Sequence, residues 1–286
     1  MKLVRVWTSF QRICGSSACC AAIYLTAGSV SAATIDIGKP ASESLTPDGV
    51  YWTFDGGTVD DWMPDMVEDK SGNGFIGKLL SGAQEQPPKY VQGKFGTAIH
   101  FDINLPKEGV DPSKNDKYPN SRVGWSSSDP DSPPDEKKLD MAEASFSGGA
   151  WVKLDAIRSG EPQIVMIFQQ GMPSSWHFRL IKDAADQWKI HFNGVRSTQV
   201  TEAFNDLAWH HVGFTFEKGD TGGAVTFWLD GQPLENPVTV KDSIAPLPAE
   251  GRRLFTVGES NLGYFSEGFT GSMDDAFVTT GVHTFQ

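Results

Sequence analysis

Cysteine is almost absent from this chain. The three cysteines, Cys14, Cys19 and Cys20, all lie near the N-terminus, so the rest of the sequence has no disulfide framework. A stable fold does not require one, because a domain of about 250 residues buries a sizeable hydrophobic core. Long apolar runs are also absent after residue 32, so we expect no membrane span in the mature chain.

Basic residues are in deficit: 24 Lys and Arg stand against 36 Asp and Glu, for a formal net charge of −12. A surface this acidic repels nucleic acid and anionic membranes, so we expect no nucleic-acid partner. It also disfavours an anionic polysaccharide as ligand unless basic residues gather locally. Neutral glycans and Ca2+ are compatible with such a surface.

The first 32 residues have the composition of a signal peptide. Basic residues precede an apolar stretch, 13–30, and Val30-Ser31-Ala32 fits a small-x-small cleavage signal. Two alternatives are disfavoured: a membrane anchor, because the stretch is short and rich in Gly, Ser and Thr, and lipidation of Cys19, because Ser-Ser-Ala precedes it. The leader predicts a secreted, periplasmic or cell-envelope protein. Neither the cleavage position nor the oligomeric state follows from it.

The pattern after the leader is that of β-structure. Residues 33–48 form a polar lead-in with little to pack, and short alternating apolar runs separated by Gly, Pro, Asn and Asp then extend to the C-terminus. Helical periodicity is lacking. We therefore expect one all-β domain over 49–286. A long, polar, Pro-rich insert at about 103–144 interrupts it, and its residues 122–125 could form a short strand.

One predicted hairpin carries a polar face. In the runs 176–180 and 188–192, aromatic and aliphatic residues alternate with polar ones, and the link between the runs is short. Because successive side chains of a strand point to opposite faces, His177, Arg179, Lys189 and His191 share one face.

Several short phrases, taken in order, resemble the laminin-G-like jelly-roll domain of the concanavalin A-like lectin/glucanase superfamily. They are YWTFDGG (51–57), DKSGNGFIGKL (69–79), KFGTAIHFD (94–102), GGAWVKLD (148–155), WHHVGFTFE (209–217), VTFWLDGQPL (225–234) and GSMDDAFV (271–278). The resemblance covers roughly residues 48–283. It implies an antiparallel two-sheet jelly-roll β-sandwich in which the last strand, 276–280, pairs with the first, 50–54.

The resemblance also raises the expectation of a structural Ca2+ site. Asp55, Asp69, Asn73 and Asp275, together with Asp274, supply the hard oxygen ligands that Ca2+ prefers, and similar relatives often hold one such ion. The alternative is that Asp69 and Asn73 only form Asx-turns and that Asp275 caps a turn. The pair His210-His211 is not expected to share an ion, because adjacent strand residues point to opposite faces.

The candidate ligand-binding residues are Trp125, Tyr118, His177, Arg179 and His191. Trp125 and Tyr118 lie in the polar insert, where no core needs them, so they could stack on sugar rings. Arg179 and the two histidines could bind the carboxylate of a uronic acid. With Tyr264 as proton donor, the same residues could serve a polysaccharide lyase. The alternative is local loop packing for Trp125 and Tyr118, and an ordinary solvated strand face for Arg179 and the histidines.

Other enzyme classes are less well supported. The E-x-D-x-x-E run of the glucanase branch is missing, and so are Ser-His-Asp, phosphate-loop and dinucleotide-binding patterns. The leading hypothesis is therefore a secreted non-catalytic recognition module that binds carbohydrate or a glycosylated or extracellular protein partner. A polysaccharide lyase or hydrolase is the alternative, and an adhesion or structural protein of the envelope is the third.

Overall fold

The computed structural model describes residues 32–41, 48–61, 66–79, 88–101, 123–126, 139–157, 159–171, 175–247, 254–258 and 269–286. The chain divides into two units, Met1–Ser31 and Ala32–Gln286. The predicted signal peptide therefore lies almost wholly outside the described residues. In the described part of the chain, no helix has the length and hydrophobicity needed to cross a bilayer.

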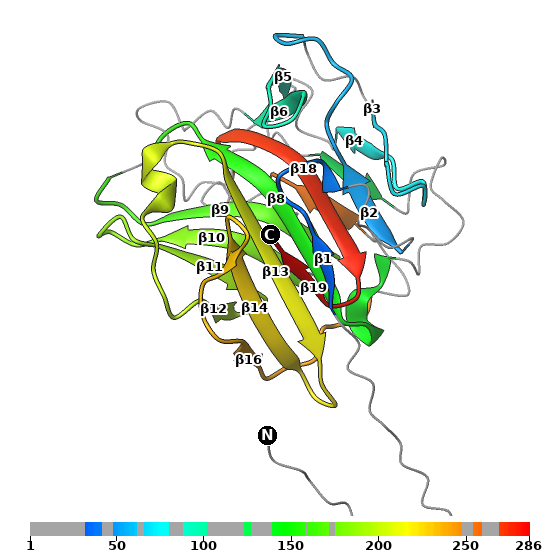
Figure 1. Ribbon diagram of the computed structural model, residues 1–286, viewed down its shortest axis with the longest axis vertical. Coiled ribbons are helices and arrows are strands. Elements are labelled where there is room, and N and C mark those ends of the chain that lie inside the picture. The colour runs from blue at the N-terminus through cyan, green and yellow to red at the C-terminus, as the bar shows by residue number, and fades with distance from the viewer. Residues whose placement is uncertain are drawn as a thin grey trace, which may run out of the picture. The chain divides into compact units, whose positions relative to one another are not determined.

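Two large antiparallel sheets form the second unit (Figure 1). The nine-stranded sheet has the order β15 (Gln232–Pro233), β14 (Gly223–Leu229), β13 (His210–Lys218), β8 (Phe146–Leu154), β18 (Gly271–Thr280), β6 (Thr97–Phe101) and β5 (Lys89–Gln92), with β16 (Val238–Val240) on β14 and β2 (Gly49–Trp52) on β18. The expected pairing of first and last strands is confirmed, since Tyr51 pairs with Phe277.

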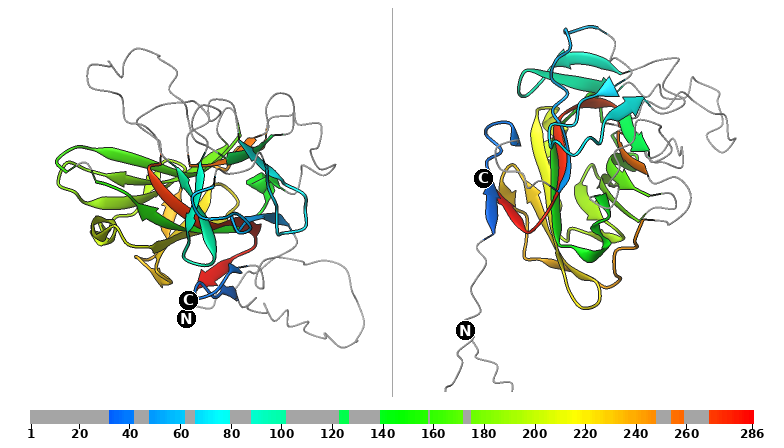
Figure 2. Two further views of the ribbon diagram at one scale, coloured as in Figure 1. Left: turned by 90° about the horizontal axis from the view of Figure 1, so that it is seen from above. Right: turned by 90° about the vertical axis from the view of Figure 1, so that its right-hand side faces the viewer.

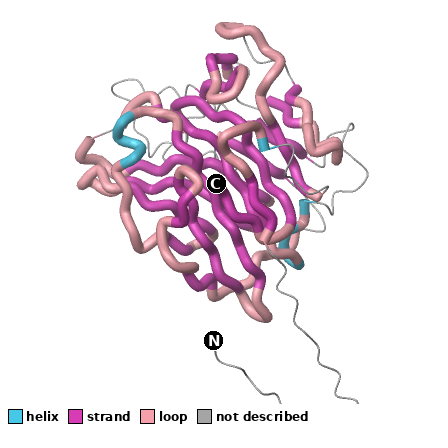
Figure 3. The backbone as a smooth tube through the Cα atoms, in the orientation of Figure 1, coloured by secondary structure: helices cyan, strands magenta, loops and turns pink. Residues whose placement is uncertain are grey.

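The eight-stranded sheet has the order β12 (Val195–Arg196), β11 (Trp188–Phe192), β10 (Trp176–Lys182), β9 (Gln163–Gln170), β17 (Leu254–Val257), β7 (Val123–Ser126), β4 (Gly77–Leu79) and β3 (Met66–Val67). Figure 2 shows the two sheets as layers. The described helices are the short 3-10 turns η3 (Met141–Glu143) and η4 (Ala203–Asp206), so strand dominates the tube of Figure 3. The predicted all-β sandwich is confirmed.

Aromatic rings fill the space between the sheets. The centroids of Phe192 and Phe214 lie 4.7 Å apart, and those of Phe146 and Trp176 lie 5.2 Å apart. Because these residues hold alternate positions on their strands, one face of each sheet is continuously apolar. Burial of such large rings is the main stabilising contribution in a unit that contains no cysteine after residue 20.

The prediction that the lead-in 33–48 has little to pack is wrong for its first residues. β1 (Ala33–Ile35) pairs in parallel with β19 (His283–Phe285), and this two-stranded sheet covers the outer face of the nine-stranded sheet. Ile35 is fully buried there against a second apolar cluster that includes Trp151, Trp228 and Phe285. The polar composition of this segment gave no indication that Ile35 and Ile37 alternate as buried residues. Their burial depends on β19, about 250 positions later in the chain.

Candidate functional site

The eight-stranded sheet carries no acidic residue in any of its strands, although the protein as a whole is strongly acidic. Its strands β10, β11 and β12 instead hold basic residues, most of which alternate along the strand with buried apolar residues. The outward ones, which we call the cationic face, are His177, Arg179, Lys189, His191 and Arg196. Three of the 24 Lys and Arg residues, Arg179, Lys189 and Arg196, thus lie on this face of a sheet whose strands contain no carboxylate.

Strand register brings the cationic face together. β10 and β11 pair as the predicted antiparallel hairpin, with Arg179 opposite His191, and β12 places Arg196 on the other side of His191. The next basic residue along β10, Lys182, is not part of this face. It is buried on the core side, where its ammonium group donates to backbone carbonyls and to Asp186.

The two histidines of this face are neutral near pH 7. Their rings stack at 5.0 Å with an interplanar angle of 19°. Burial, with Arg179 as a further cause, lowers the pKa of His177 to about 4 and that of His191 to about 3. Arg179 Nε donates to His191 Nδ1 at 3.2 Å, and the Nε2 atom of His177 is buried without a hydrogen-bond partner. Arginine and lysine therefore supply the charge, and the imidazoles supply neutral polar groups.

Trp125 is not the exposed stacking platform that the sequence suggested. It lies in β7, as the expected short strand, and its side chain is 2% exposed. The indole packs edge-on against Phe75, with ring centroids 5.2 Å apart. A core position inside a polar insert cannot be recognised from local composition, and this caused the error. Tyr118 and Tyr264 lie outside the described residues.

Asp69 and Asn73 do not join the other predicted metal ligands. Both carboxylate oxygens of Asp69 accept hydrogen bonds from neighbouring backbone amides, namely those of Tyr51, Ser71 and Phe75. The side-chain amide of Asn73 donates to the carbonyl of Gly49 at 2.9 Å. The Asx-turn interpretation is therefore correct for this loop, and the four-residue metal set is not assembled.

Two of the other predicted ligands, Asp274 and Asp55, meet at the turn 93–97. Asp274 Oδ2 accepts from the amide of Phe95 at 2.9 Å, and Asp55 Oδ1 accepts from the amide of Thr97 at 3.0 Å. Asp275, at a positive φ of 54°, instead accepts from the amide of Ala41 and from the Tyr51 hydroxyl. The backbone irregularity between β18 and β8 at this point separates the two neighbouring carboxylates.

Asp274 Oδ1 is buried and has no hydrogen-bond partner. Burial raises the pKa of Asp274 to about 8, and the nearby Asp275 and Asp55 add to the shift. An orphaned carboxylate oxygen beside a second carboxylate fits a hard cation such as Ca2+. Among the described residues, however, no group of three or more His, Cys, Asp or Glu side chains could hold a metal. Carbonyl oxygens or water would have to complete the coordination.

The two histidines at the start of β13 have separate roles. His210 lies between two carboxylates, with Nδ1 2.8 Å from Asp230 and Nε2 3.0 Å from Asp206, and these hydrogen bonds raise its pKa. His211 points to the other face of the sheet, is 2% exposed, and packs edge-on against Trp151. As predicted from strand alternation, the two side chains lie on opposite faces.

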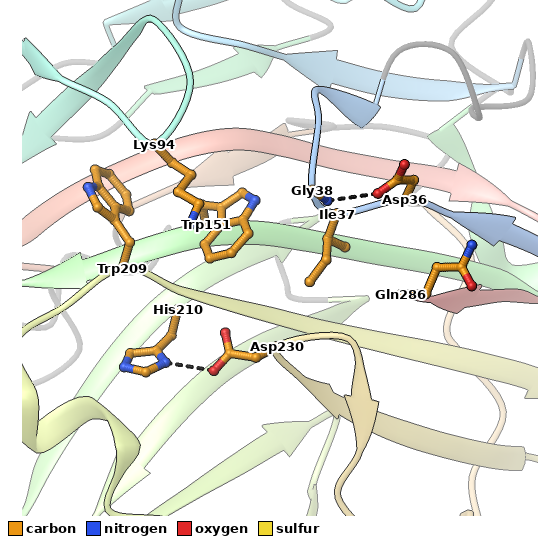
Figure 4. Close-up of a pocket in the computed structure, with 9 residues that line it drawn as sticks. All are labelled: Asp36, Ile37, Gly38, Lys94, Trp151, Trp209, His210, Asp230 and Gln286. Atoms are coloured by element: carbon orange, nitrogen blue, oxygen red, sulfur yellow. Dashed lines mark hydrogen bonds and ion pairs between the residues drawn. The ribbon is translucent and has the colours of Figure 1, made fainter.

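Sequence reasoning missed a cleft of about 540 Å³ beside His210, on the outer face of the nine-stranded sheet (Figure 4). We call it the terminal cleft, because Asp36 after β1 and Gln286 after β19 line it together with Trp151 and Trp209. Trp151 lies on the outward phase of β8, since Ala150 and Val152 on either side face the sandwich interior, and it packs in the second apolar cluster at 6% exposure.

The sequence profile of the laminin G-type group of the concanavalin A-like lectin/glucanases superfamily matches residues 130–284. The chain belongs to this family. No curated protein shows significant similarity to it.

Solved structures of several proteins resemble the fold. One is Trypanosoma rangeli sialidase in complex with sialic acid, at 14% identity and a TM-score of 0.47, covering 82% of this chain and 31% of the sialidase. Another is the mouse laminin alpha1 LG4-5 pair, at 16% identity and a TM-score of 0.34, covering 48% and 36% of the two chains. The chain thus spans about a third of each of these proteins, and such distant likenesses carry no argument about function.

Proposed function

We propose that the protein is a secreted, non-catalytic recognition module that binds an anionic glycan on its cationic face. The observation that carries the proposal is the complete lack of Asp and Glu in the eight strands of a sheet that belongs to a protein with 36 acidic residues. Fixed cations on a rigid sheet attract carboxylate or sulfate groups that the rest of the surface repels. Secretion follows from the predicted leader.

Arg179 is the central residue of this proposal. It stands opposite His191 in the register, is partly exposed, and has a planar guanidinium suited to bidentate recognition of a carboxylate. Lys189 lies on the neighbouring strand β11 and Arg196 on β12 beyond it, so the face extends across three strands. A glycan that carries a negative charge on every sugar residue could therefore contact several of these cations at the same time.

Turnover is disfavoured by the state of the histidines. A general base for proton abstraction is most effective when its pKa lies near the operating pH. The pKa values of about 4 for His177 and about 3 for His191 make both imidazoles weak bases. His191 Nδ1 also already accepts a hydrogen bond from Arg179.

We further propose that Ca2+ binds at the turn 93–97, with Asp274 and Asp55 as its carboxylate ligands. Support comes from the buried, unpartnered Oδ1 of Asp274 and from the proximity of Asp55, which contributes to the raised pKa of Asp274. The ion would neutralise buried carboxylates and hold this turn against β18. Its contribution is to stability, because no reacting group lies among its ligands.

Binding of a polyuronate oligosaccharide tests the proposed function. Calorimetric titration of the mature protein with a hexauronate should give saturable binding that weakens as salt is raised. Arg179→Met should reduce affinity about tenfold, because a charge-assisted hydrogen bond contributes roughly 1.5–3 kcal/mol. Exposed Arg196→Met, which carries little folding risk, should also weaken binding, and Lys153→Met on the other sheet is the matched control.

Two results would count against this function. Equal affinities for the wild type, Arg179→Met and Arg196→Met would remove the cationic face from recognition. Ultraviolet absorbance from new unsaturated ends during incubation with the polyuronate would show a lyase instead of a binder.

A further inference from the structure

The terminal cleft is a second candidate site, separate from the cationic face. It lies on the outer face of the nine-stranded sheet, whereas the cationic face belongs to the eight-stranded sheet. Its volume of about 540 Å³ lies within the range of small-molecule sites. Neither the family resemblance nor the sequence motifs assign a role to it.

Two indoles form its apolar surface. Trp151 projects from β8, and Trp209 precedes β13 and is partly exposed. Lys94, from the turn between β5 and β6, places its ammonium group 4.1 Å from the ring centroid of Trp151 (Figure 4). The far side of Trp151 packs against the buried His211, which fixes the indole in place. Trp151 is itself buried, at 6% exposure, so the partly exposed Trp209 that packs against its cluster supplies the face for stacking against the C–H side of a sugar ring.

Two carboxylates that line the cleft, Asp36 and Asp230, are held in place by hydrogen bonds from backbone amides. Asp230 has a positive φ of 49°, and its carboxylate accepts from the backbone amide of His211 and bonds to the ring of His210. Asp36 accepts from the amide of Gly38. Each carboxylate oxygen has two lone-pair directions, so both groups retain capacity to accept from sugar hydroxyls. Because these acceptors are anchored by backbone contacts, binding would require little reorganisation.

We infer that the terminal cleft binds an uncharged sugar residue of a glycan, stacked on Trp209 and hydrogen-bonded by Asp36 and Asp230. Asp36 forms an ion pair with Lys39 at 3.6 Å and Asp230 bonds to His210, so these carboxylates serve as hydrogen-bond acceptors for sugar hydroxyls. The inference is independent of the proposed function, since it rests on a different sheet.

The test is a fluorescence and calorimetric titration of the mature protein with neutral hexasaccharides of glucose, mannose, xylose and galactose. At least one should bind and change tryptophan emission. Trp209→Ala should lower its affinity about fivefold to tenfold, because the sugar loses the aromatic face on which it stacks. Asp36→Asn, which keeps an acceptor for Gly38 and so keeps the fold, should also weaken binding.

Cross-controls separate this site from the cationic face. Arg179→Met should leave neutral-sugar binding unchanged, and Trp209→Ala should leave hexauronate binding unchanged. The inference is overturned if no neutral hexasaccharide binds, or if one binds equally well to the wild type, Trp209→Ala and Asp36→Asn. It is also overturned if neutral-sugar affinity falls with Arg179→Met, because the sugar would then occupy the other sheet.

Discussion

Replacing His211 with phenylalanine should make the protein more resistant to acid. His211 is 2% exposed between Trp151 and Phe285, and neither of its ring nitrogens has a hydrogen-bond partner. Burial lowers its pKa to about 3, and the only opposing cause is the nearby Asp230. The folded protein therefore holds this imidazole neutral, whereas the unfolded chain protonates it at its ordinary pKa of about 6.5.

The sign and size of the effect follow from proton linkage. Because the pKa is depressed in the folded state, the stability contribution of His211 is complete above pH 6.5 and is lost as the pH falls toward 3. Acidification to pH 5 crosses about 1.5 pH units of this window, which corresponds to roughly 2 kcal/mol at 1.36 kcal/mol per unit. Phenylalanine does not titrate, so His211→Phe should lack this loss.

Urea unfolding at pH 7.5 and pH 5 measures the difference. The free energy of unfolding should fall by about 2 kcal/mol less in His211→Phe than in the wild type. Any packing cost of the larger ring is the same at both pH values and cancels in the difference.

His210→Gln is the control, and its effect on the pH dependence of stability should have the opposite sign. Asp230 and Asp206 raise the His210 pKa, so its stability contribution is present below pH 6.5 and is lost at higher pH. Identical pH dependence in the wild type and His211→Phe would refute the reasoning.

Two further predictions concern the metal and the first strand. Ca2+ should raise the thermal midpoint, and EDTA or Asp274→Asn should abolish the rise, because a ligand that binds only the folded state must stabilise it; an unchanged midpoint contradicts the proposed ligands. Ile35→Ala should cost about 3 kcal/mol, since truncating a buried isoleucine costs roughly 2–5 kcal/mol, whereas the exposed Thr34→Ala on the same strand should change stability little. Equal stability of these two variants would show that β1 does not cover the second apolar cluster.

Local patterns in the sequence predicted the parts of the fold that depend on neighbouring residues. Alternation around His177 and His191 predicted the β10–β11 hairpin and its polar face. The pairing of β2 with β18 was available only from the family resemblance. Strand periodicity indicates which side chains share a face but not which distant strand lies beside them.

The errors arose where distant segments decide burial. Trp125 is a core residue because β4 and β17 flank its short strand, and nothing in the surrounding polar insert indicates this. Ile35 is buried because β19 returns to it from the other end of the chain. The terminal cleft is lined by six separate segments, so no local motif could reveal it.

The central claim is that the acid-free sheet receives an anionic glycan. Side-chain NMR of the arginine Nε–Hε groups during titration with a hexauronate tests it most directly. Arg179 and Arg196 should shift together and saturate with one dissociation constant. Shifts confined to arginines outside β10 and β12, or none under conditions where binding is measured by calorimetry, would contradict the claim.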